Sequence, residues 1–164
     1  MLAFAFQPEH DKIFPMEEKT VARNRKAKFE FFILETLEAG ISLVGSEIKS
    51  IRASQVSLEE AYIKVDGHEA WLMDAHIAPY VLANRFNHEP RRNRRLLLHK
   101  KEILELWNEV RQKGVTIIPV RLYIKDGRAK VEIAVAKGKK LYDKRADIAK
   151  KDIQREMERK LKDY

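Results

Sequence analysis

The sequence predicts a mainly β domain with inserted helices, which we expect to close into a six-stranded antiparallel barrel. Three observations predict this fold class. Short segments alternate apolar and polar residues, as half-buried strands do. Two pairs of these segments flank an Asp-Gly turn, which is a strong hairpin signal. The segments also carry apolar residues on both faces, which favours a barrel, because closure leaves no exposed sheet edge.

Composition divides the 164-residue chain into three parts. Residues 1–18 show no periodic pattern, and we expect them to form a poorly ordered N-terminal extension. The apolar run in this extension ends at Phe6, which is shorter than the roughly 7–15 residues of a signal-peptide core. Residues 19–136 carry the strand patterns and should form the barrel. Residues 137–164 form a flexible basic C-terminal tail.

The first half of the barrel region contains two strand patterns and a helix. Residues 29–34 have strand periodicity, and residues 41–44 form a second strand after a turn expected at residues 38–40. The next segment, GSEIKSIRAS, predicts a short helix that Ser46 can cap, with its two isoleucines facing the core.

Two hairpins and a longer helix complete the pattern. AYIKVDGHEAWLMDAHI and VTIIPVRLYIKDGRAKVEIAVA each predict two strands around an Asp-Gly turn, with the glycines at Gly67 and Gly127. In the second hairpin, the even-numbered residues of 118–124 should share the core face. Between the hairpins, a helix should begin after His99 at the N-cap position and end at Gly114.

Positive charge is concentrated at the C-terminus. The formal net charge is +8, and residues 137–164 contain eleven Lys and Arg against six Asp and Glu, so +5 of the surplus lies there. Such a concentration indicates a polyanionic partner, either nucleic acid or an anionic membrane surface. Within the tail, Ala149, Ile153, Met157 and Leu161 form a narrow apolar stripe on a potential helix. Because such a helix is marginal alone, we expect it to fold on contact with RNA; the alternative is a surface helix folded back on the barrel.

The sequence gives little support for catalysis. It contains no cysteine, which excludes disulfides, a thiolate zinc site and a Cys nucleophile. No spacing suggests a Ser–His–Asp triad or a paired-carboxylate site, so we expect no catalytic residues, no metal and no cofactor. The segment 66–76 does carry two His and three carboxylates, and a metal-dependent hydrolase using it is the alternative from another class. Polar residues on the rim of a hairpin are, however, normally solvated.

Two basic segments favour RNA binding by an OB-like barrel, a small closed barrel of the oligonucleotide-binding type. Residues 23–28 precede the first predicted strand, and RRNRRLLLHKK (91–101) leads into the longer helix. Backbone N–H groups at a helix N-terminus favour phosphate, and nearby cations suit a protein that binds the RNA backbone. A generic single-strand binder is an alternative, but it needs exposed stacking aromatics, and most aromatics here have strand phases suited to the core.

Three long segments together resemble one known family. NRKAKFEFFILETLEAGISLVGSEIKSIR is similar to its first strands and helix, EPRRNRRLLLHKKEI to its basic loop and second helix, and KVEIAVAKGKKLYDKR to its last strand and tail junction. From about Val21 to Tyr164, the chain thereby resembles the SmpB (SsrA-binding protein) family. The resemblance implies a barrel that binds the tRNA-like domain of transfer-messenger RNA (tmRNA). It also implies a tail that enters the decoding centre and empty mRNA channel of a stalled ribosome, which is then rescued by trans-translation while the incomplete peptide is tagged.

The resemblance further implies roles for individual residues and partners. The positions that match the family's RNA-binding residues are Asn24, Arg25, Lys26, Glu38, Leu97, His99, Lys100, Lys130 and Lys137. Those that match its decoding-centre contacts are Lys139, Lys140, Tyr142, Asp143, Lys144 and Arg145. Gly138 would be a flexible junction. The implied partners are tmRNA and the stalled bacterial ribosome, with alanyl-tRNA synthetase and elongation factor Tu acting indirectly through the RNA. A cytoplasmic monomer without membrane contact is expected.

Overall fold

The computed structural model describes residues 18–162, so the expectations for the N-terminal extension lie outside the described residues. The elements are β1 (Glu18–Arg23), α1 (Ala27–Glu30), β2 (Phe31–Ile41), α2 (Gly45–Arg52), β3 (Val56–Ser57), β4 (Tyr62–Val65), β5 (Ala70–Met73), β6 (His76–Ile77), the 3-10 helix η1 (Val81–Phe86), β7 (Arg94–Leu97), α3 (Lys100–Lys113), β8 (Thr116–Lys125), β9 (Arg128–Gly138) and α4 (Leu141–Lys162). The protein is mainly β with helices, as the sequence predicts. In the described part of the chain, no helix is both long and apolar enough to cross a membrane.

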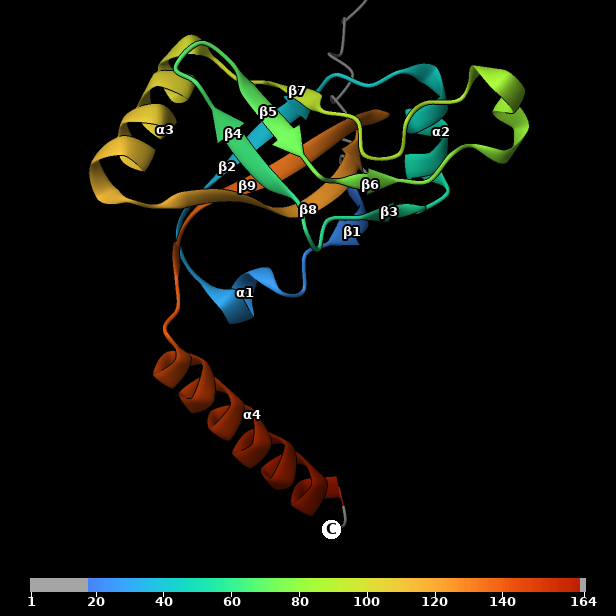
Figure 1. Cartoon of the computed structure of the whole chain (residues 1–164). Helices are drawn as coiled ribbons and strands as arrows, with labels where there is room; N and C mark the ends of the chain where they lie inside the picture. Colours follow the sequence, from blue (N-terminus) through green and yellow to red (C-terminus); the bar gives the residue numbers. More distant parts are fainter. Residues whose placement is uncertain (1–17, 163–164) are drawn as a thin grey trace, which may run out of the picture.

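Seven strands form one antiparallel sheet in the order β1-β8-β4-β5-β7-β2-β9, and β3 pairs with β6 separately (Figure 1). Because β8 also pairs with β9, the strand pairings lead from β8 through β4, β5, β7, β2 and β9 back to β8. The expected number of six strands is wrong. The sequence pattern misses β1, β3 and β7, which have between two and six residues each, and β6 lies within the second strand predicted for the first hairpin. The separate strand expected at residues 41–44 is wrong, because β2 ends at Ile41.

The strand β2 runs straight through the position where we expected a turn. It spans Phe31–Ile41 and pairs with β9 along nearly its whole length. Gly40, read as a turn residue, lies inside this strand, and a Cβ added there would come within 3.1 Å of the Leu97 Cβ. Glycine at this position therefore allows β7 to approach closely, which is the other common reason for glycine in a strand. Phe29, expected in the strand, belongs to α1.

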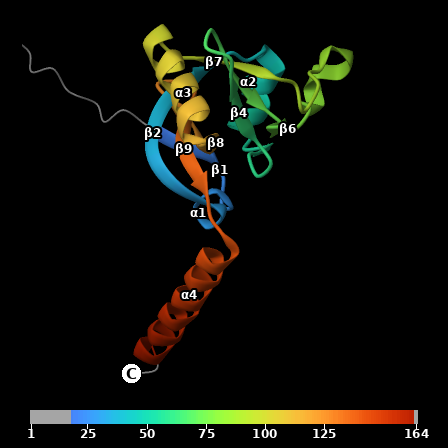
Figure 2. The same cartoon turned by 60° about the vertical axis from the view of Figure 1, so that its left-hand side comes forward.

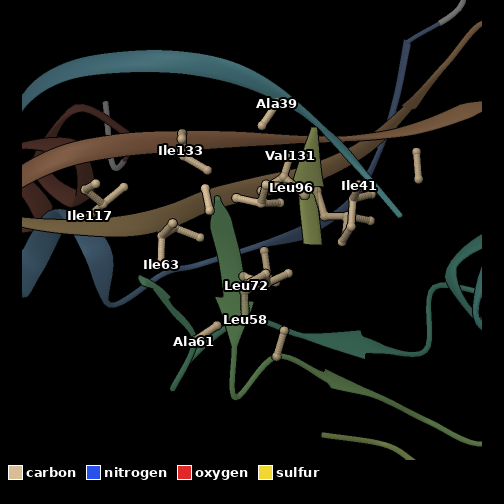
Figure 3. Packing of buried hydrophobic residues seen from close by; sticks show 14 of the residues in the cluster. Ala39, Ile41, Leu58, Ala61, Ile63, Leu72, Leu96, Ile117, Val131 and Ile133 are labelled. Atoms are coloured by element: carbon tan, nitrogen blue, oxygen red, sulfur yellow. The ribbon is translucent and has the colours of Figure 1, made fainter. Parts of the chain in front are cut away.

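The main core is built from the inward-facing residues of the sheet. Figure 3 shows Ile63, Leu72, Leu96, Ile117 and Val131, from five different strands, packed together. Each of these side chains is at most 6% exposed. Full burial of an aliphatic side chain stabilises the fold by roughly 1.5–3 kcal/mol, so the sheet is held chiefly by this cluster.

A bulge in β8 divides its side chains between two apolar clusters. The pairing of β8 with β9 shifts between Pro119 and Arg121, so the strict alternation that the sequence predicts for this strand is wrong. Ile117 joins the main core, whereas Ile118 joins a second cluster with Ala27 of α1. This second cluster holds α1 against the other face of β8 and β9.

The two predicted Asp-Gly turns and the longer helix are confirmed. Gly67 and Gly127 have positive φ angles of 87° and 73°, which glycine adopts without strain. At Gly67 an added Cβ would also meet the ring of Trp107 at 3.2 Å, so α3 packs directly on this turn. The helix α3 has His99 as its N-cap and ends at Gly114, which is left-handed as a C-terminal stop should be.

The helix α4 projects away from the sheet as a single 22-residue rod (Figures 1 and 2). None of its residues is buried, and the predicted apolar stripe is open: Ile153, Met157 and Leu161 are 54%, 60% and 78% exposed. The tail does not fold back over the sheet, which was the alternative to a helix that forms on contact with RNA. That this helix depends on contact with RNA stays a prediction. Near its start, α4 contacts α1, which lies between it and the sheet.

Candidate nucleic-acid interface

The first candidate surface is the hairpin face, formed by the end of β2, Leu97 of β7 and the β8–β9 turn. Glu38 lies at its centre and accepts a hydrogen bond from the hydroxyl group of Tyr123. Its carboxylate also pairs with the ammonium groups of Lys130, at 3.3 Å, and Lys125, at 3.7 Å. One carboxylate therefore orients two lysines, and the group keeps a net positive charge.

The pKa of Glu38 and the pKa of Tyr123 are shifted in opposite directions. The hydrogen bond from Tyr123 lowers the pKa of Glu38, and Lys130 and Lys125 lower it further, although partial desolvation acts in the opposite direction. Desolvation and the Glu38 carboxylate together raise the pKa of Tyr123. At neutral pH, Glu38 is thus a carboxylate that accepts a hydrogen bond from a protonated phenol.

A depression of about 440 Å³ adjoins these lysines at the end of β2. Its lining combines aliphatic side chains with two cations from the β8–β9 hairpin: Gly40, Ile41, Leu43, Ile48, Leu97, Gly127, Arg128, Ala129 and Lys130. Leu97 is 58% exposed at its edge. An apolar floor beside cations suits an unstacked base together with its phosphates.

Leu97 also leads directly into the N-terminus of α3, where His99 and Lys100 are exposed. The His99 backbone N–H donates to the Glu102 carboxylate at 2.8 Å, which is half of a capping box. Lys100 is the first residue of the helix, where backbone N–H groups favour an anion. The structure therefore places Leu97, His99 and Lys100 within four consecutive positions, next to the hairpin face.

A second group of predicted RNA-binding residues lies at the opposite end of the same strands. Lys130 pairs with Gly40, whereas Lys137 pairs with Phe32. Seven residues of extended strand separate the two lysines, which corresponds to about 23 Å. Arg25 is exposed at this second end, and Lys26 pairs with Glu59 at 3.3 Å. Lys137 is exposed as well.

Asn24, which the resemblance places among the RNA contacts, is a structural residue in this fold. It is only 8% exposed. Its side-chain amide donates to the Pro119 carbonyl at 3.2 Å, and its side-chain oxygen accepts the Ala27 N–H at 3.1 Å. Both ends of the side chain thus hold α1 against β8, so Asn24 has a structural role, and its contact with RNA stays a prediction.

The third surface is the start of the tail. Tyr142 is 66% exposed, and Arg145 is also exposed, so both side chains are available to a partner. Asp143 instead accepts the Lys140 backbone N–H at 3.1 Å, which caps α4, and the Lys144 ammonium lies 5.9 Å from the Phe29 ring centre. Lys139 is the exception among the predicted contacts, because its side chain is only 9% exposed.

The basic loop is largely neutralised by carboxylates within the chain. Arg91 pairs with Glu60 at 2.9 Å, and Arg95 pairs with Glu69 at 3.0 Å. Arg92 and Arg94 both pair with a third glutamate. These four arginines therefore have counter-charges from distant segments of the chain. Arg94 is fully buried, whereas Arg91 and Arg95 remain about half exposed, so phosphate binding by this loop stays a prediction.

That third glutamate is Glu47, the centre of a buried network between α2 and β7. Glu47 and Arg94 are both fully buried, and their side chains meet at 2.8 Å. Burial alone would raise the pKa of Glu47, but hydrogen bonds from Arg92, the Val44 N–H and Arg94 lower it below its usual value. The predicted Ser46 cap is wrong, since Val44 is the N-cap and its N–H is bonded to Glu47 instead.

The segment proposed for a metal has another role. Asp66 accepts the backbone N–H groups of His68, at 2.9 Å, and Glu69, at 2.8 Å, which fixes the turn. These bonds lower the pKa of Asp66. Glu69 is in turn paired with Arg95. Among residues 18–162, no group of three or more His, Cys, Asp or Glu side chains is placed to hold a metal ion.

Several aromatic residues are more exposed than their strand phases predict. Phe29, Phe32, Tyr62 and Phe86 are 41%, 45%, 41% and 80% exposed. They lie on α1, β2, β4 and η1 rather than on one stacking platform. Lys125 and Arg128 also lie at the hairpin face, and their position beside an Asp-Gly turn is the only sequence feature that points to them.

Comparisons with known proteins show which family the chain resembles. The family model described as "SmpB protein" matches residues 21–163. A protein of Desulforudis audaxviator named "SsrA-binding protein" is 57% identical over 142 residues, covering 87% of this chain and 93% of its own length. A second "SsrA-binding protein", from Roseiflexus castenholzii, is 54% identical over 147 residues, covering 89% and 93%.

Among solved structures, a chain from work described as "tmRNA-SmpB: a journey to the center of the bacterial ribosome" superposes with a TM-score of 0.61 at 42% identity. The match covers 78% of this chain and 87% of the other. The likeness thus extends over sequence and fold together, and the residues that the family model matches include both the hairpin face and the start of the tail. The chain therefore belongs to the SmpB family.

Proposed function

We propose that this protein binds the tRNA-like domain of tmRNA through the hairpin face and delivers it to stalled ribosomes for trans-translation. The observation that carries the proposal is the group around Glu38, which pairs with Lys125 and Lys130, together with the adjoining depression, which Lys130 lines beside aliphatic side chains. Lysines held in this way can contact phosphates, while the depression receives an unpaired base. The family's names, "SsrA-binding protein" and "tmRNA-SmpB", support tmRNA as the RNA.

In this proposal the ring of strand pairings acts as a closed, OB-like barrel, and residues 137–164 act on the ribosome. The tail enters the decoding centre and the empty mRNA channel, where Tyr142 stacks on a base and Arg145 contacts phosphate. The open apolar stripe of α4 then packs in the channel. Stacking and phosphate contact need no catalytic group, so the protein acts as a binding factor without enzyme activity.

The proposal also covers partners and location. The direct partners are tmRNA and the small ribosomal subunit, and alanyl-tRNA synthetase and elongation factor Tu are reached through the RNA. A monomer suffices, because one hairpin face and one tail bind one RNA and one ribosome. Since the ribosome is the site of action, the protein works in the cytoplasm.

The decisive experiment compares RNA affinities of matched variants of the full chain. Glu38→Gln keeps an oxygen for Tyr123 but removes the charge that orients both lysines, and Lys130→Gln removes one phosphate contact. Each should weaken binding of the isolated tRNA-like domain by roughly 1–3 kcal/mol at fixed salt. The control is Lys64→Gln on β4, which lies three pairings away from β2 in the ring.

The control variant should bind like the unaltered protein, since it loses the same positive charge as Lys130→Gln but on the opposite side of the ring. Sequencing of the RNA that co-purifies with the unaltered chain should show tmRNA enriched over transfer RNA. Equal affinities of all three variants would remove the hairpin face from the interface. Co-purification of ribosomal RNA without tmRNA would contradict the proposed function as a whole.

A further inference from the structure

One lysine side chain connects three elements at the point where the tail leaves the sheet. The Lys139 ammonium donates to the backbone carbonyl of Lys28 in α1 at 2.8 Å and to the Asp147 carboxylate in α4 at 2.6 Å. It also lies 4.9 Å from the centre of the Phe32 ring in β2. A carbonyl, a carboxylate and an aromatic face thus surround a single cation.

The burial of this side chain distinguishes it from its neighbours. Lys139 has a side-chain exposure of 9%, whereas Lys140 and Lys137 on either side are exposed. The Lys139 ammonium is shielded from water and Asp147 is 40% exposed, so salt should weaken this ion pair less than a pair in which both groups are exposed. Lys139 is therefore engaged within the protein and is not a free cation for rRNA.

The backbone supports the same geometry. The Lys139 N–H donates to the Glu30 carbonyl at 2.8 Å, so the chain is held at this residue by main chain and side chain together. Gly138, which the resemblance suggests as a flexible junction, is the last residue of β9 and pairs with Phe31. The direction of α4 is therefore set after Gly138, where the Lys139 bonds meet the first two turns of the helix.

We propose that Lys139 is a positioning residue, a latch that fixes the angle at which α4 leaves the sheet. Asp147 is its ionic partner on α4, and the Lys28 carbonyl and the Phe32 ring are its contacts in α1 and β2. Beyond Asp147 the tail has no comparable anchor among the described residues. The latch thus holds the first two turns and leaves the rest of the helix to its partner.

This inference deepens the proposed function. Its consequence for the ribosome rests on that function, whereas the position of α4 in the free protein does not. A tail that is aimed before binding loses less orientational freedom on entering a narrow channel, so association is favoured. Opening the latch should therefore slow peptide tagging while leaving affinity for the isolated tRNA-like domain unchanged. The geometric claim itself concerns the free protein and can be tested without RNA.

The test measures the distance between two spin labels in the free, full-length protein. The chain has no native cysteine, so Lys64→Cys on β4 and Glu156→Cys on α4 can be labelled specifically. Fifteen residues of helix separate Leu141 from Glu156, or about 22 Å, so a swing of 20° moves the second label by about 8 Å. Pulsed electron–electron double resonance resolves a change of this size.

With the latch intact, the distance distribution should have a single narrow peak. Lys139→Gln and Asp147→Asn should each broaden it by at least about 8 Å, because either removes the ionic bond to α4. Lys139→Arg should keep it narrow, since a guanidinium can bond to both oxygens and stack on Phe32. Lys140→Gln is the matched control for the lost charge and should leave the distance distribution narrow.

A broad distribution in the unaltered protein would overturn the latch, and so would equal widths for the Lys139→Gln and Lys140→Gln variants. Circular dichroism checks that α4 stays helical in each variant, so that a broadened peak reports a change of angle. RNA affinity is measured on the same samples. Weak binding of tmRNA by the unaltered protein would contradict the proposed function, whereas the distance distributions decide on the latch alone.

Discussion

Replacing Glu47 with glutamine tests whether the buried network holds the fold together. The two carboxylate oxygens accept four hydrogen bonds: Arg92 donates at 3.1 Å and 2.6 Å, Arg94 at 2.8 Å, and the Val44 N–H at 2.9 Å. Glutamine has the same shape but only one oxygen, and its NH₂ group would face donors. The variant thus removes one charge and at least one acceptor without creating a cavity.

The expected cost follows from the burial of both partners. Glu47 and Arg94 are fully buried, so the variant leaves a guanidinium without its counter-charge in the protein interior. Removing one partner of a buried pair costs about 3–5 kcal/mol. Arg94 keeps bonds to the carbonyls of Ala75, Arg92 and Pro90, which satisfy its donors but supply no negative charge. The free energy of unfolding of a domain is about 5–15 kcal/mol in total, so this loss of stability would be severe.

Urea unfolding monitored by circular dichroism measures the free energy of unfolding, and Glu60→Gln is the matched control. Glu60 pairs with Arg91 at the surface, with side-chain exposures of 66% and 52%, so its loss should cost less than about 1 kcal/mol. Because the folded state lowers the pKa of Glu47, it binds fewer protons than the unfolded state near that pKa. The contribution of Glu47 is therefore complete at neutral pH and is lost as the pH falls from about 4.3 through the folded value.

The difference between the unaltered protein and Glu47→Gln should accordingly shrink on acidification. A loss of unfolding free energy in Glu47→Gln that is no larger than the loss in Glu60→Gln at neutral pH would refute a supporting role for the network. So would a difference in stability between the unaltered protein and Glu47→Gln that grows as the pH is lowered. In either case the buried network would not contribute to the stability of the folded state.

Three further predictions concern separate parts of the molecule. A chain that ends at Lys140 should keep its affinity for the tRNA-like domain, with a shallower salt dependence, but should lose peptide tagging in reconstituted translation. Gly127→Ala should lower the free energy of unfolding by about 1–2 kcal/mol, because alanine must then adopt a positive φ angle. Gly67→Ala should cost more, because its added methyl group also meets the tryptophan ring of α3, and equal costs would contradict that contact. Glu102→Ala should cost about 1 kcal/mol of stability because its carboxylate caps α3, whereas His99→Ala should chiefly weaken RNA binding; equal stability losses would assign His99 to capping.

The fold class could be predicted where local signals decide the structure. Gly67 and Gly127 need positive φ angles, and Gly114 ends a helix with a clear apolar face, so these features follow from short segments. Gly40 could not be assigned in the same way, because its reason is the approach of Leu97 from another strand. The bulge near Val120 depends equally on pairing with β9, which no local pattern encodes.

The candidate site could be predicted less fully, for electrostatic reasons. Sequence reveals where cations are, but not which of them are neutralised by carboxylates from distant segments. Arg92 and Arg94 therefore looked available although Glu47 binds both. Conversely, Lys125 attracted no notice, because its relation to Glu38 arises only when β8, β9 and β2 are assembled. Charge in the sequence locates an interface only after the internal ion pairs have been identified.

The two ends of the β2–β9 pair explain how one small domain can couple RNA binding to the direction of its tail. At one end Gly40 pairs with Lys130 beside the depression, and at the other Phe32 pairs with Lys137, close to the Lys139 latch. Pairing over about 23 Å, with one register shift between Ile33 and Glu35, connects the two ends, and bending the strands would break ladder hydrogen bonds. In the proposed complex, an RNA bound at the first end would therefore fix the position of the second. The angle of α4 relative to the bound RNA then depends on the latch, which is why the loss of one buried cation should matter more than the loss of an exposed neighbour.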